Sequence, residues 1–473
     1  MVDGREIAAQ FEDAADFETR KVLCGGQLLT VLFLDGLTSG GDIAEQVVRP
    51  LAQMTDEARE EVLFTRAMQG GVWCASVKEA ESTQQAAELL VNGFCVILFP
   101  RSGKALGCEV KTGEKRSPSP PETENTVKGA KDAFTETLRT NTSLVRRHLR
   151  TPGLRLAETV IGKRTLTKVT VCWIDRLTDP ELPRRMQERL SSIDIDGALS
   201  PAAIEEYVTG SRRTAFPLLE YTERTDHFCQ GLLDGQVGLL ADGLPLGYLA
   251  PVGLGRLMRS PEDRATDFFS ASMLRLLRYA ALGVSLLLPA LYAAMAMFHQ
   301  QMLPTKLLLS IIESKQNVPF STLLEVLGLL CAFELLQQAG LHLPQAVGTA
   351  VSIIGGLVVG TAAVDAKLVS PAALIVTASS GICGFTLPNR ELSDAVRLWR
   401  FVLTVLAGLW GLFGVTVGLL LLLTELAGLE SLGRSYLSPF GRAEVKGALV
   451  RPRLVRQKWR DGALKPMDDQ NQR

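Results

Sequence analysis

The sequence predicts an α/β amino-terminal region made of two small α/β subdomains, followed by an all-α membrane domain that crosses the bilayer several times. Charged and apolar stretches alternate before Ser270, as in soluble proteins, whereas residues 273–429 are dominated by Leu, Ala, Gly and Val. The chain has 473 residues, which is too long for one compact domain. Its 50 basic residues nearly balance its 51 acidic ones, so no nucleic-acid partner is expected.

The first subdomain is expected over residues 1–100. Strands are predicted at 28–34, 72–77 and 94–99, with helices at 42–51 and 79–91, because period-two and helical apolar patterns alternate there. Residues 101–126 are polar and proline-rich and predict a linker.

The second subdomain is expected over residues 127–265. A helix at 133–150 has one apolar face and a separate stripe formed by Arg139, Arg146 and Arg150. These arginines are candidates for binding an anion or an acidic partner, and a solvated helix surface is the commoner alternative. Paired strands are predicted at 154–161 and 166–174, a helix at 180–191, and a final strand pair at 236–240 and 246–249.

Familiar catalytic and metal-binding motifs do not emerge from the chain. Its eight cysteines form no CxxC pair, and most lie in apolar runs where a cysteine behaves as a small hydrophobic residue. Asp194-Ile195-Asp196-Gly197 lacks the further carboxylates of a calcium loop, so a turn is expected there. The Gly162-Lys163 pair lacks the upstream glycine of a phosphate-binding loop. We therefore expect no enzyme activity, no metal and no cofactor.

The membrane domain is expected over residues 266–430. A helix needs roughly 20 apolar residues to cross the hydrocarbon core, and segments 276–298, 347–364 and 401–424 meet that length. Segment 369–387 is a fourth, less apolar candidate. Segment 303–340 is predicted to form a re-entrant or interfacial hairpin, because 303–312 is too short to span and the rest carries two acids.

Charge predicts the orientation. Arg275 and Arg278 precede the first span, and residues 431–473 form a basic tail, so both ends are expected in the cytoplasm. The amino terminus has no basic and apolar signal-peptide pattern, which agrees with a cytosolic α/β region. Two cytoplasmic ends require an even number of crossings, and four is the simplest number.

Two spans carry small residues along one helical face. One face, in the span 347–364, is formed by Thr349, Ser352, Gly356, Gly360 and Ala363. The other, in the span 401–424, is formed by Ala407, Gly411, Gly414 and Gly418. Small residues let helices approach closely in lipid, so packing within the chain is one interpretation. A subunit interface or the wall of a narrow pathway is the alternative.

Three acids are candidates for channel or coupling functions. Glu325 and Glu334 lie about 180° apart on a helical wheel, so each needs its own partner. Asp365 lies at the end of a predicted span. Ionisable groups at membrane depth are costly and usually face a cavity or an ion path, whereas acids at the interface would simply be hydrated.

Several motifs, in order along nearly the whole chain, resemble the spore germination GerA family, the A-subunits of germinant receptors in endospore-forming bacteria. They include Leu34-Asp35-Gly36-Leu37, Arg139-Thr140-Asn141-Thr142-Ser143, Thr222-Glu223-Arg224-Thr225-Asp226, Ser260-Pro261-Glu262-Asp263, Leu288-Pro289-Ala290-Leu291-Tyr292, His299-Gln300-Gln301-Met302-Leu303-Pro304-Thr305 and Ala332-Phe333-Glu334-Leu335-Leu336. Thr225 departs from the family pattern, in which proline is usual.

The resemblance implies a receptor for small nutrients in the spore inner membrane, acting with a transporter-like B-subunit and a lipoprotein C-subunit. It further implies a homo-oligomer, embedded in membrane lipid, that forms a nutrient-gated ion channel and performs no catalysis. Two alternatives remain: a sporulation paralogue associated with the dipicolinic acid channel, and a solute transporter.

Overall fold

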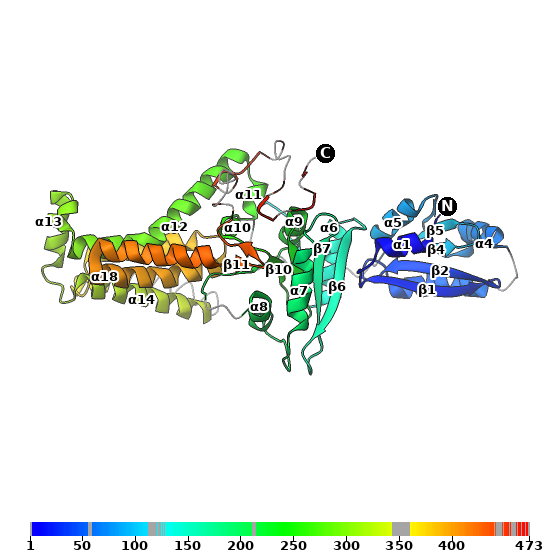
Figure 1. The fold of residues 1–473 in the computed structure, drawn as a ribbon, viewed down its shortest axis with the longest axis horizontal. Helices are drawn as coiled ribbons and strands as arrows, with labels where there is room; N and C mark the ends of the chain where they lie inside the picture. Colours follow the sequence, from blue (N-terminus) through cyan, green and yellow to red (C-terminus); the bar gives the residue numbers. More distant parts are fainter. Residues whose placement is uncertain are drawn as a thin grey trace.

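The computed structural model describes residues 2–54, 59–111, 121, 124, 126, 128–210, 214–342 and 360–438, together with short stretches between 440 and 471. The molecule is elongated. The first α/β subdomain lies at one end, the second in the middle and a helical bundle at the other end (Figure 1). The predicted order of an α/β region followed by an all-α membrane domain is therefore confirmed.

The first subdomain is a five-stranded antiparallel sheet covered by helices on both faces. Its strand order is β1-β2-β4-β5-β3. Strand β4 is buried along its whole length: Cys95 and Ile97 pack under the helices after β2, and Val96 and Leu98 pack under α1 and α5. The elements are α1 (Gly4–Gln10), β1 (Phe17–Cys24), β2 (Gln27–Leu34), α2 (Gly40–Asp42), a π-helix (Ile43–Val48), α3 (Arg49–Gln53), α4 (Glu60–Arg66), β3 (Val77–Ala80), α5 (Thr83–Val91), β4 (Phe94–Phe99) and β5 (Lys104–Glu109).

Two expected boundaries in this subdomain are wrong. The strand predicted at 72–77 is β3, which begins only at Val77, and α5 begins at Thr83 because the Ser82 side chain accepts a hydrogen bond from the Gln85 amide. The sheet also extends beyond residue 100, since β5 pairs with both β4 and β3. Strand β5 lies inside the linker predicted at 101–126, because that prediction rests on the polar, proline-rich composition of the whole stretch. Residues 112–120 of that linker lie outside the described residues.

The second subdomain repeats the topology of the first. Its strands are arranged in the order β6-β7-β9-β10-β8. This is the order of the first sheet, since β6 to β10 take the places of β1 to β5, and every pairing is again antiparallel. Helices also occupy equivalent places along the two sequences. In each subdomain they precede the first strand hairpin and flank the strand that comes third in the sequence, β3 or β8. The elements are α6 (Leu138–His148), β6 (Leu154–Ile161), β7 (Thr167–Ile174), α7 (Glu181–Ser191), α8 (Pro201–Thr209), β8 (Glu220–Thr222), α9 (Thr225–Asp234), β9 (Val237–Ala241) and β10 (Gly247–Ala250).

The helical bundle follows two short helices that leave the second subdomain. The two short helices are α10 (Leu254–Leu257) and α11 (Glu262–Ala265). The bundle itself consists of α12 (Phe268–Met297), α13 (Thr305–Lys315), α14 (Thr322–His342), α16 (Gly360–Asp365), α17 (Pro371–Phe385) and α18 (Arg390–Gly428). Among the described residues, α12, 322–340 and α18 are long and apolar enough to cross a membrane. The expected span 347–364 lies largely outside the described residues, and α17 covers most of the expected span 369–387.

Helix α18 is a hairpin rather than one straight span. Gly411 has φ 61° and ψ −141°, a conformation open to glycine alone, and it reverses the chain. The arms 390–410 and 412–428 then run antiparallel, since Leu392 shares a buried cluster with Leu426 and Leu403 shares one with Val415. The prediction of one crossing at 401–424 is therefore wrong, because hydropathy does not show a reversal made by one glycine.

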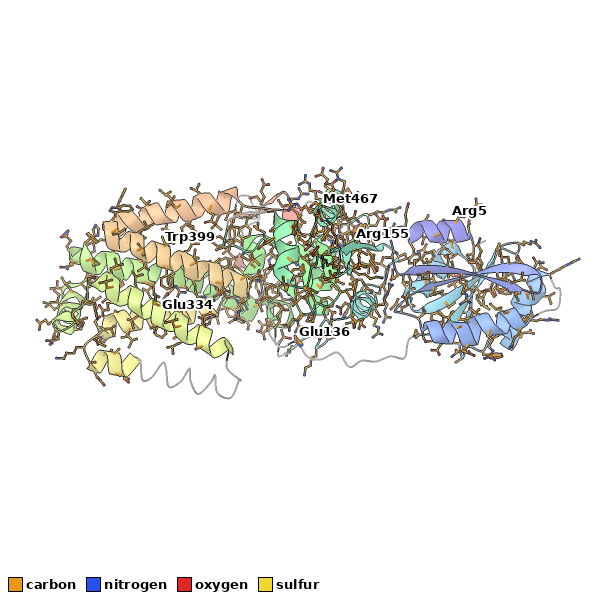
Figure 2. The ribbon with its side chains drawn as sticks, turned by 90° about the horizontal axis from the view of Figure 1, so that it is seen from below. Arg5, Glu136, Arg155, Glu334, Trp399 and Met467 are labelled. Atoms are coloured by element: carbon orange, nitrogen blue, oxygen red, sulfur yellow. The ribbon has the colours of Figure 1, made fainter. Side chains whose placement is uncertain are left out.

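Helix α14 packs along α17 and α18, and it does not resemble a short interfacial hairpin. Glu334 in its middle lies beside α18 in the bundle (Figure 2). The expected hairpin at 303–340 thus divides into the peripheral helix α13 and a helix long enough to span. The two acids that suggested a hairpin are each paired inside the protein, which removes most of their cost in lipid.

The chain returns to the second subdomain after the bundle. Strands β11 (Glu430–Ser431) and β12 (Arg434–Ser435) form a small hairpin whose Leu432 enters the core of that subdomain. Ser431 Oγ donates a hydrogen bond to the Leu218 carbonyl at 2.6 Å and accepts one from the Val252 amide at 3.0 Å. Both chain ends of the bundle are consequently attached to the same subdomain, on the same side.

Candidate functional site

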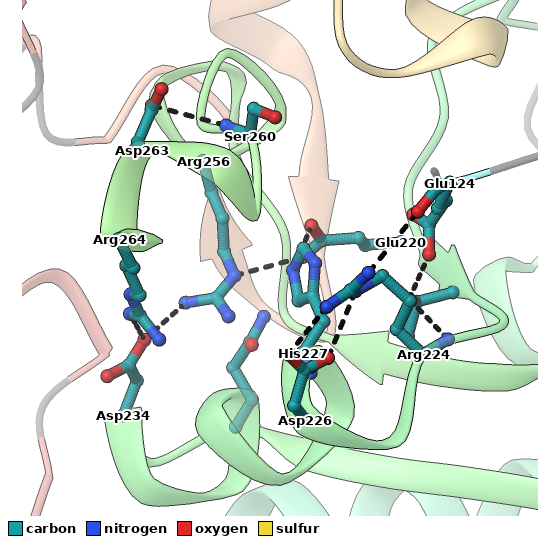
Figure 3. A network of polar contacts seen from close by, with 12 residues as sticks. Glu124, Glu220, Arg224, Asp226, His227, Asp234, Arg256, Ser260, Asp263 and Arg264 are labelled. Carbon is teal, nitrogen blue, oxygen red and sulfur yellow. Dashed lines mark hydrogen bonds and ion pairs between the residues drawn. The ribbon is translucent and has the colours of Figure 1, made fainter. Parts of the chain in front are cut away.

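A cluster of largely buried charges joins the second subdomain to the first membrane helix, and Figure 3 shows its members on the second subdomain, α10 and α11. We call this group the junction cluster. It is assembled from β8, α9, α10, α11 and α12 and surrounds a cavity of about 180 Å³. Its members are Glu220, Asp226, His227, Asp234, Arg256, Asp263, Arg264, Arg275 and Arg278.

Arg256 on α10 bridges two acids of the second subdomain. Its Nε lies 2.9 Å from Glu220 Oε2 on β8, and its Nη1 lies 3.0 Å from Asp234 Oδ2 at the end of α9. His227 Nε2 is 3.0 Å from the other Glu220 oxygen, and Arg264 Nη2 is 3.0 Å from Asp234 Oδ2. Charge-assisted contacts of this kind fix the short helices α10 and α11 against the sheet.

The pKa values of the two acids show that both are held ionised. Burial alone would raise the pKa of Glu220, but the charges of Arg256 and His227 outweigh it and lower the pKa to about 2. Burial likewise opposes ionisation of Asp234, and Arg256 with Arg264 lowers its pKa to about 2. Glu220 and Asp234 therefore keep their negative charges near neutral pH.

Asp263 connects the second subdomain to α12. Its side chain is 1% exposed. It accepts hydrogen bonds from Arg275 Nη2 at 3.1 Å and from Arg278 Nη1 at 2.8 Å, and Ser260 donates its amide to the same carboxylate at 3.3 Å. Arg275 and Arg278 were expected to serve only as positive charges that set the membrane orientation. In the structure they fasten the start of the first span to α11.

The end of the predicted linker belongs to the second subdomain. Arg224 is almost fully buried and directs two nitrogens to Asp226, at 2.7 and 3.0 Å, and a third to Thr126 Oγ1 at 2.7 Å. Glu124 accepts a hydrogen bond from Thr222 Oγ1 at 2.5 Å. Residues 124 and 126 thus dock on the motif at 222–226, which explains why that motif is so polar.

The arginine stripe of α6 joins the two subdomains. Arg146 is 1% exposed, and its Nε and Nη2 each lie 2.7 Å from a different oxygen of Asp16 in the first subdomain. Arg139 Nε is 3.1 Å from Asp35 Oδ2. Arg150 is exposed and donates to the Arg147 carbonyl. The acidic partner considered from sequence is therefore present for two of the three arginines, inside the same chain.

The acids of the bundle do not share one site. Glu325 is buried, lies 3.5 Å from Lys315 Nζ and accepts a hydrogen bond from the Ser370 amide. Glu334 Oε1 accepts from Arg397 Nη1 at 2.8 Å. Asp365 is exposed at the end of α16. Sequence reasoning found these acids but missed Arg397, the partner of Glu334, because it lies four positions before the apolar stretch predicted at 401–424.

The small-residue faces have different outcomes. Thr349, Ser352 and Gly356 lie outside the described residues, and Gly360 is buried at the start of α16, where a Cβ would lie 3.5 Å from Leu374. On α18, a Cβ at Gly414 would meet the backbone of Leu406 in the other arm. The second face therefore serves packing within the chain, between the arms of the hairpin.

The fold and its junction define an integral membrane protein in which a charged, buried joint links a duplicated α/β region to a helical bundle. Comparison with known proteins gives the family. The chain belongs to the GerA spore germination proteins, since the family described as Bacillus/Clostridium GerA spore germination protein matches residues 5–466.

Several Bacillus proteins are similar over most of their length. Uncharacterized membrane protein YfkQ of Bacillus subtilis is 36% identical over 92% of this chain and 84% of its own. Spore germination protein KA of the same organism is 34% identical over 94% and 83%, and spore germination protein GerLA of Bacillus cereus is 31% identical over 93% and 90%.

One solved structure is also similar in part. The N-terminal domain of the A subunit of the Bacillus megaterium spore germinant receptor GerK3 covers 52% of this chain and 92% of its own, with 24% identity and a TM-score of 0.42.

Proposed function

We propose that this protein is the A-subunit of a spore nutrient germinant receptor and forms a nutrient-gated ion channel in the spore inner membrane. Membership of the GerA family and the names of the relatives support the receptor assignment. In this proposal the chain oligomerises and acts with a transporter-like B-subunit and a lipoprotein C-subunit. The α/β region and the carboxyl-terminal tail face the cytoplasm.

The observation that carries the proposal is the junction at Asp263. A rotation or shift of the second subdomain would be passed directly to α12 through two buried ion pairs, and β11–β12 tie the other end of the bundle to the same subdomain. A bundle held at both ends by one moving body suits gating, because packed interfaces switch between discrete arrangements. The salt bridges within the bundle supply polar groups that the proposed ion path could use.

Reconstitution tests this proposal. The three subunits are placed in lipid vesicles loaded with potassium, and nutrient-dependent potassium release is recorded. Gly356→Leu and Gly360→Leu are then compared with Gly283→Leu, whose site on α12 has open space around it. The proposal expects release by the native receptor and its loss in the first two variants only. Unchanged release in both would show that this face neither lines nor supports the path.

A solute transporter would behave differently in the same vesicles. It would accumulate a labelled nutrient with this chain as the only protein, without potassium release. The sporulation paralogue would respond to no nutrient in the presence of the B- and C-subunits.

A further inference from the structure

A cavity of about 180 Å³ lies between α14, α17 and the first arm of α18. Its walls combine aromatic side chains with a small set of polar groups. Phe333, Phe385 and Phe401 supply apolar surface, and Glu334, Arg397 and Arg400 supply charge. Few, well-placed polar groups on apolar walls are typical of small-molecule sites.

The two arginines on this cavity are not equally balanced. Arg397 is paired with Glu334 and with Asp394. Arg400 is only 5% exposed and donates to the hydroxyl oxygen of Ser285 at 2.5 Å, and its Nε is buried without a hydrogen-bond partner. Within the part of the chain that the structure describes, no carboxylate lies within ion-pair distance of Arg400.

The neighbouring stretch of sequence cannot supply that carboxylate either. Residues 343–359, which connect α14 to α16, contain no Asp and no Glu. A guanidinium group does not lose its proton in a protein, so Arg400 keeps its charge even in lipid. Glu334 lines the same cavity but makes its direct ion pair with Arg397. A buried charge without a directly paired counter-charge costs several kcal/mol as an order of magnitude, so the position of Arg400 favours an anion in the cavity.

We infer that this cavity binds a small carboxylate, held by Arg400 and Arg397. The two residues are three positions apart, so their side chains project from the same face of α18 toward the cavity. A planar guanidinium matches a planar carboxylate with two parallel hydrogen bonds, which a spherical halide cannot form. The phenylalanines leave space for a short apolar substituent on the acid.

The site does not depend on the channel proposal, because it can be measured on this chain alone. The purified full chain is placed in lipid nanodiscs, and its thermal midpoint is followed while sodium propionate replaces sodium chloride at constant ionic strength. Binding of radiolabelled propionate is measured in parallel by equilibrium dialysis. Ligand that binds the folded state raises the midpoint by mass action.

We expect propionate to raise the midpoint of the native chain, and Arg400→Met to abolish the rise. Arg400→Lys keeps the charge but loses the planar fork, and it should bind propionate about tenfold more weakly. It also keeps the test decisive if Arg400→Met does not fold. Arg390→Gln, an exposed position at the start of the same helix, should bind like the native chain.

Two results would overturn the inference. One is no saturable propionate binding to the native chain. The other is equal binding to the native chain and to the Arg400 variants, which would place the propionate elsewhere. An equal stabilisation by chloride would overturn the preference for a carboxylate.

Discussion

Asp263 Oδ2 accepts a hydrogen bond from Arg275 Nη2 at 3.1 Å, with both side chains buried, and this contact joins α11 to the first membrane helix. Arg278 reaches the other oxygen of the same carboxylate. This carboxylate is one of several connections between the soluble and the membrane halves, beside the β11–β12 hairpin and a buried apolar cluster that Leu218 shares with Leu392 and Leu426. The position of Asp263 makes it the natural residue for testing how the halves communicate.

The joint between the two α/β subdomains should depend on Asp16. Asp16→Asn leaves Arg146 buried without its carboxylate, and breaking such a pair costs about 3–5 kcal/mol. We expect faster amide exchange in α6 and β6, measured by hydrogen–deuterium exchange of the full chain. Arg150→Gln changes an exposed arginine of the adjoining loop and should alter stability by less than about 0.5 kcal/mol. Equal protection in both variants would contradict a structural pair.

The Asp132–His148 pair should give the α/β region a pH-dependent stability. The hydrogen bond between them, 2.7 Å long, raises the pKa of His148 and lowers that of Asp132 to about 2. Because the pKa of His148 is raised in the folded state, the pair adds stability that is fully present below the unfolded pKa of about 6.5. This stability is lost as pH rises through the folded pKa. Because the pKa of Asp132 is lowered in the folded state, its contribution to stability is fully present above the unfolded pKa of about 3.9. That contribution is lost as pH falls toward the folded pKa of about 2.

The contribution of this pair is thus greatest between about pH 4 and 6.5. Proteolysis of the full chain in urea measures it as the stability difference between the native chain and Asp132→Asn. We expect a larger difference at pH 5 than at pH 9. A difference that grows toward alkaline pH would refute the assigned pairing.

The ion pair inside the bundle should behave as a coupled unit. Glu334→Gln or Arg397→Gln alone leaves one charge in the bundle without its main partner, and each should lower the thermal midpoint in detergent. The double variant removes both charges and should be more stable than the sum of the two single losses predicts, with a coupling of about 1–3 kcal/mol. Strict additivity would mean that the two side chains do not interact.

The hairpin of α18 should require glycine where its arms meet. Gly414→Ala places a methyl group against the Leu406 carbonyl, so we expect a large loss of folded protein, judged by size-exclusion chromatography. Gly283→Ala adds the same methyl group to α12 where nothing lies within 4 Å, and it should be neutral or slightly stabilising. A straight α18 would tolerate both substitutions equally.

Local patterns predicted much of the α/β region. Strand β6 was predicted with both of its ends, because eight residues alternate between two clear turns, and β4 was predicted as well. The duplicated strand order was not predicted, since it depends on which strands pair and not on any repeated motif. Cys95 and Cys172 pack in the two cores as small apolar residues, as their apolar surroundings indicated.

Contacts between distant positions account for most of what sequence did not show. Arg146 was found as part of a cationic stripe, but its partner Asp16 lies 130 positions away. Arg397 and Arg400 were not among the candidate site residues, because their contacts with α14 and α12 form only in the folded bundle. The reversal at Gly411 is likewise set by close packing that no hydropathy profile contains.

The most direct test of the central claim is nutrient-triggered potassium release from vesicles that hold the three-subunit receptor with Asp263→Asn in this chain. Glu262→Gln, the adjacent acid of α11, is the matched control. We predict normal assembly of both variants, normal release by the control and release reduced at least about tenfold by Asp263→Asn, since each buried charged contact that is lost costs a few kcal/mol. Release by an assembled Asp263→Asn receptor equal to that of the control would contradict the account.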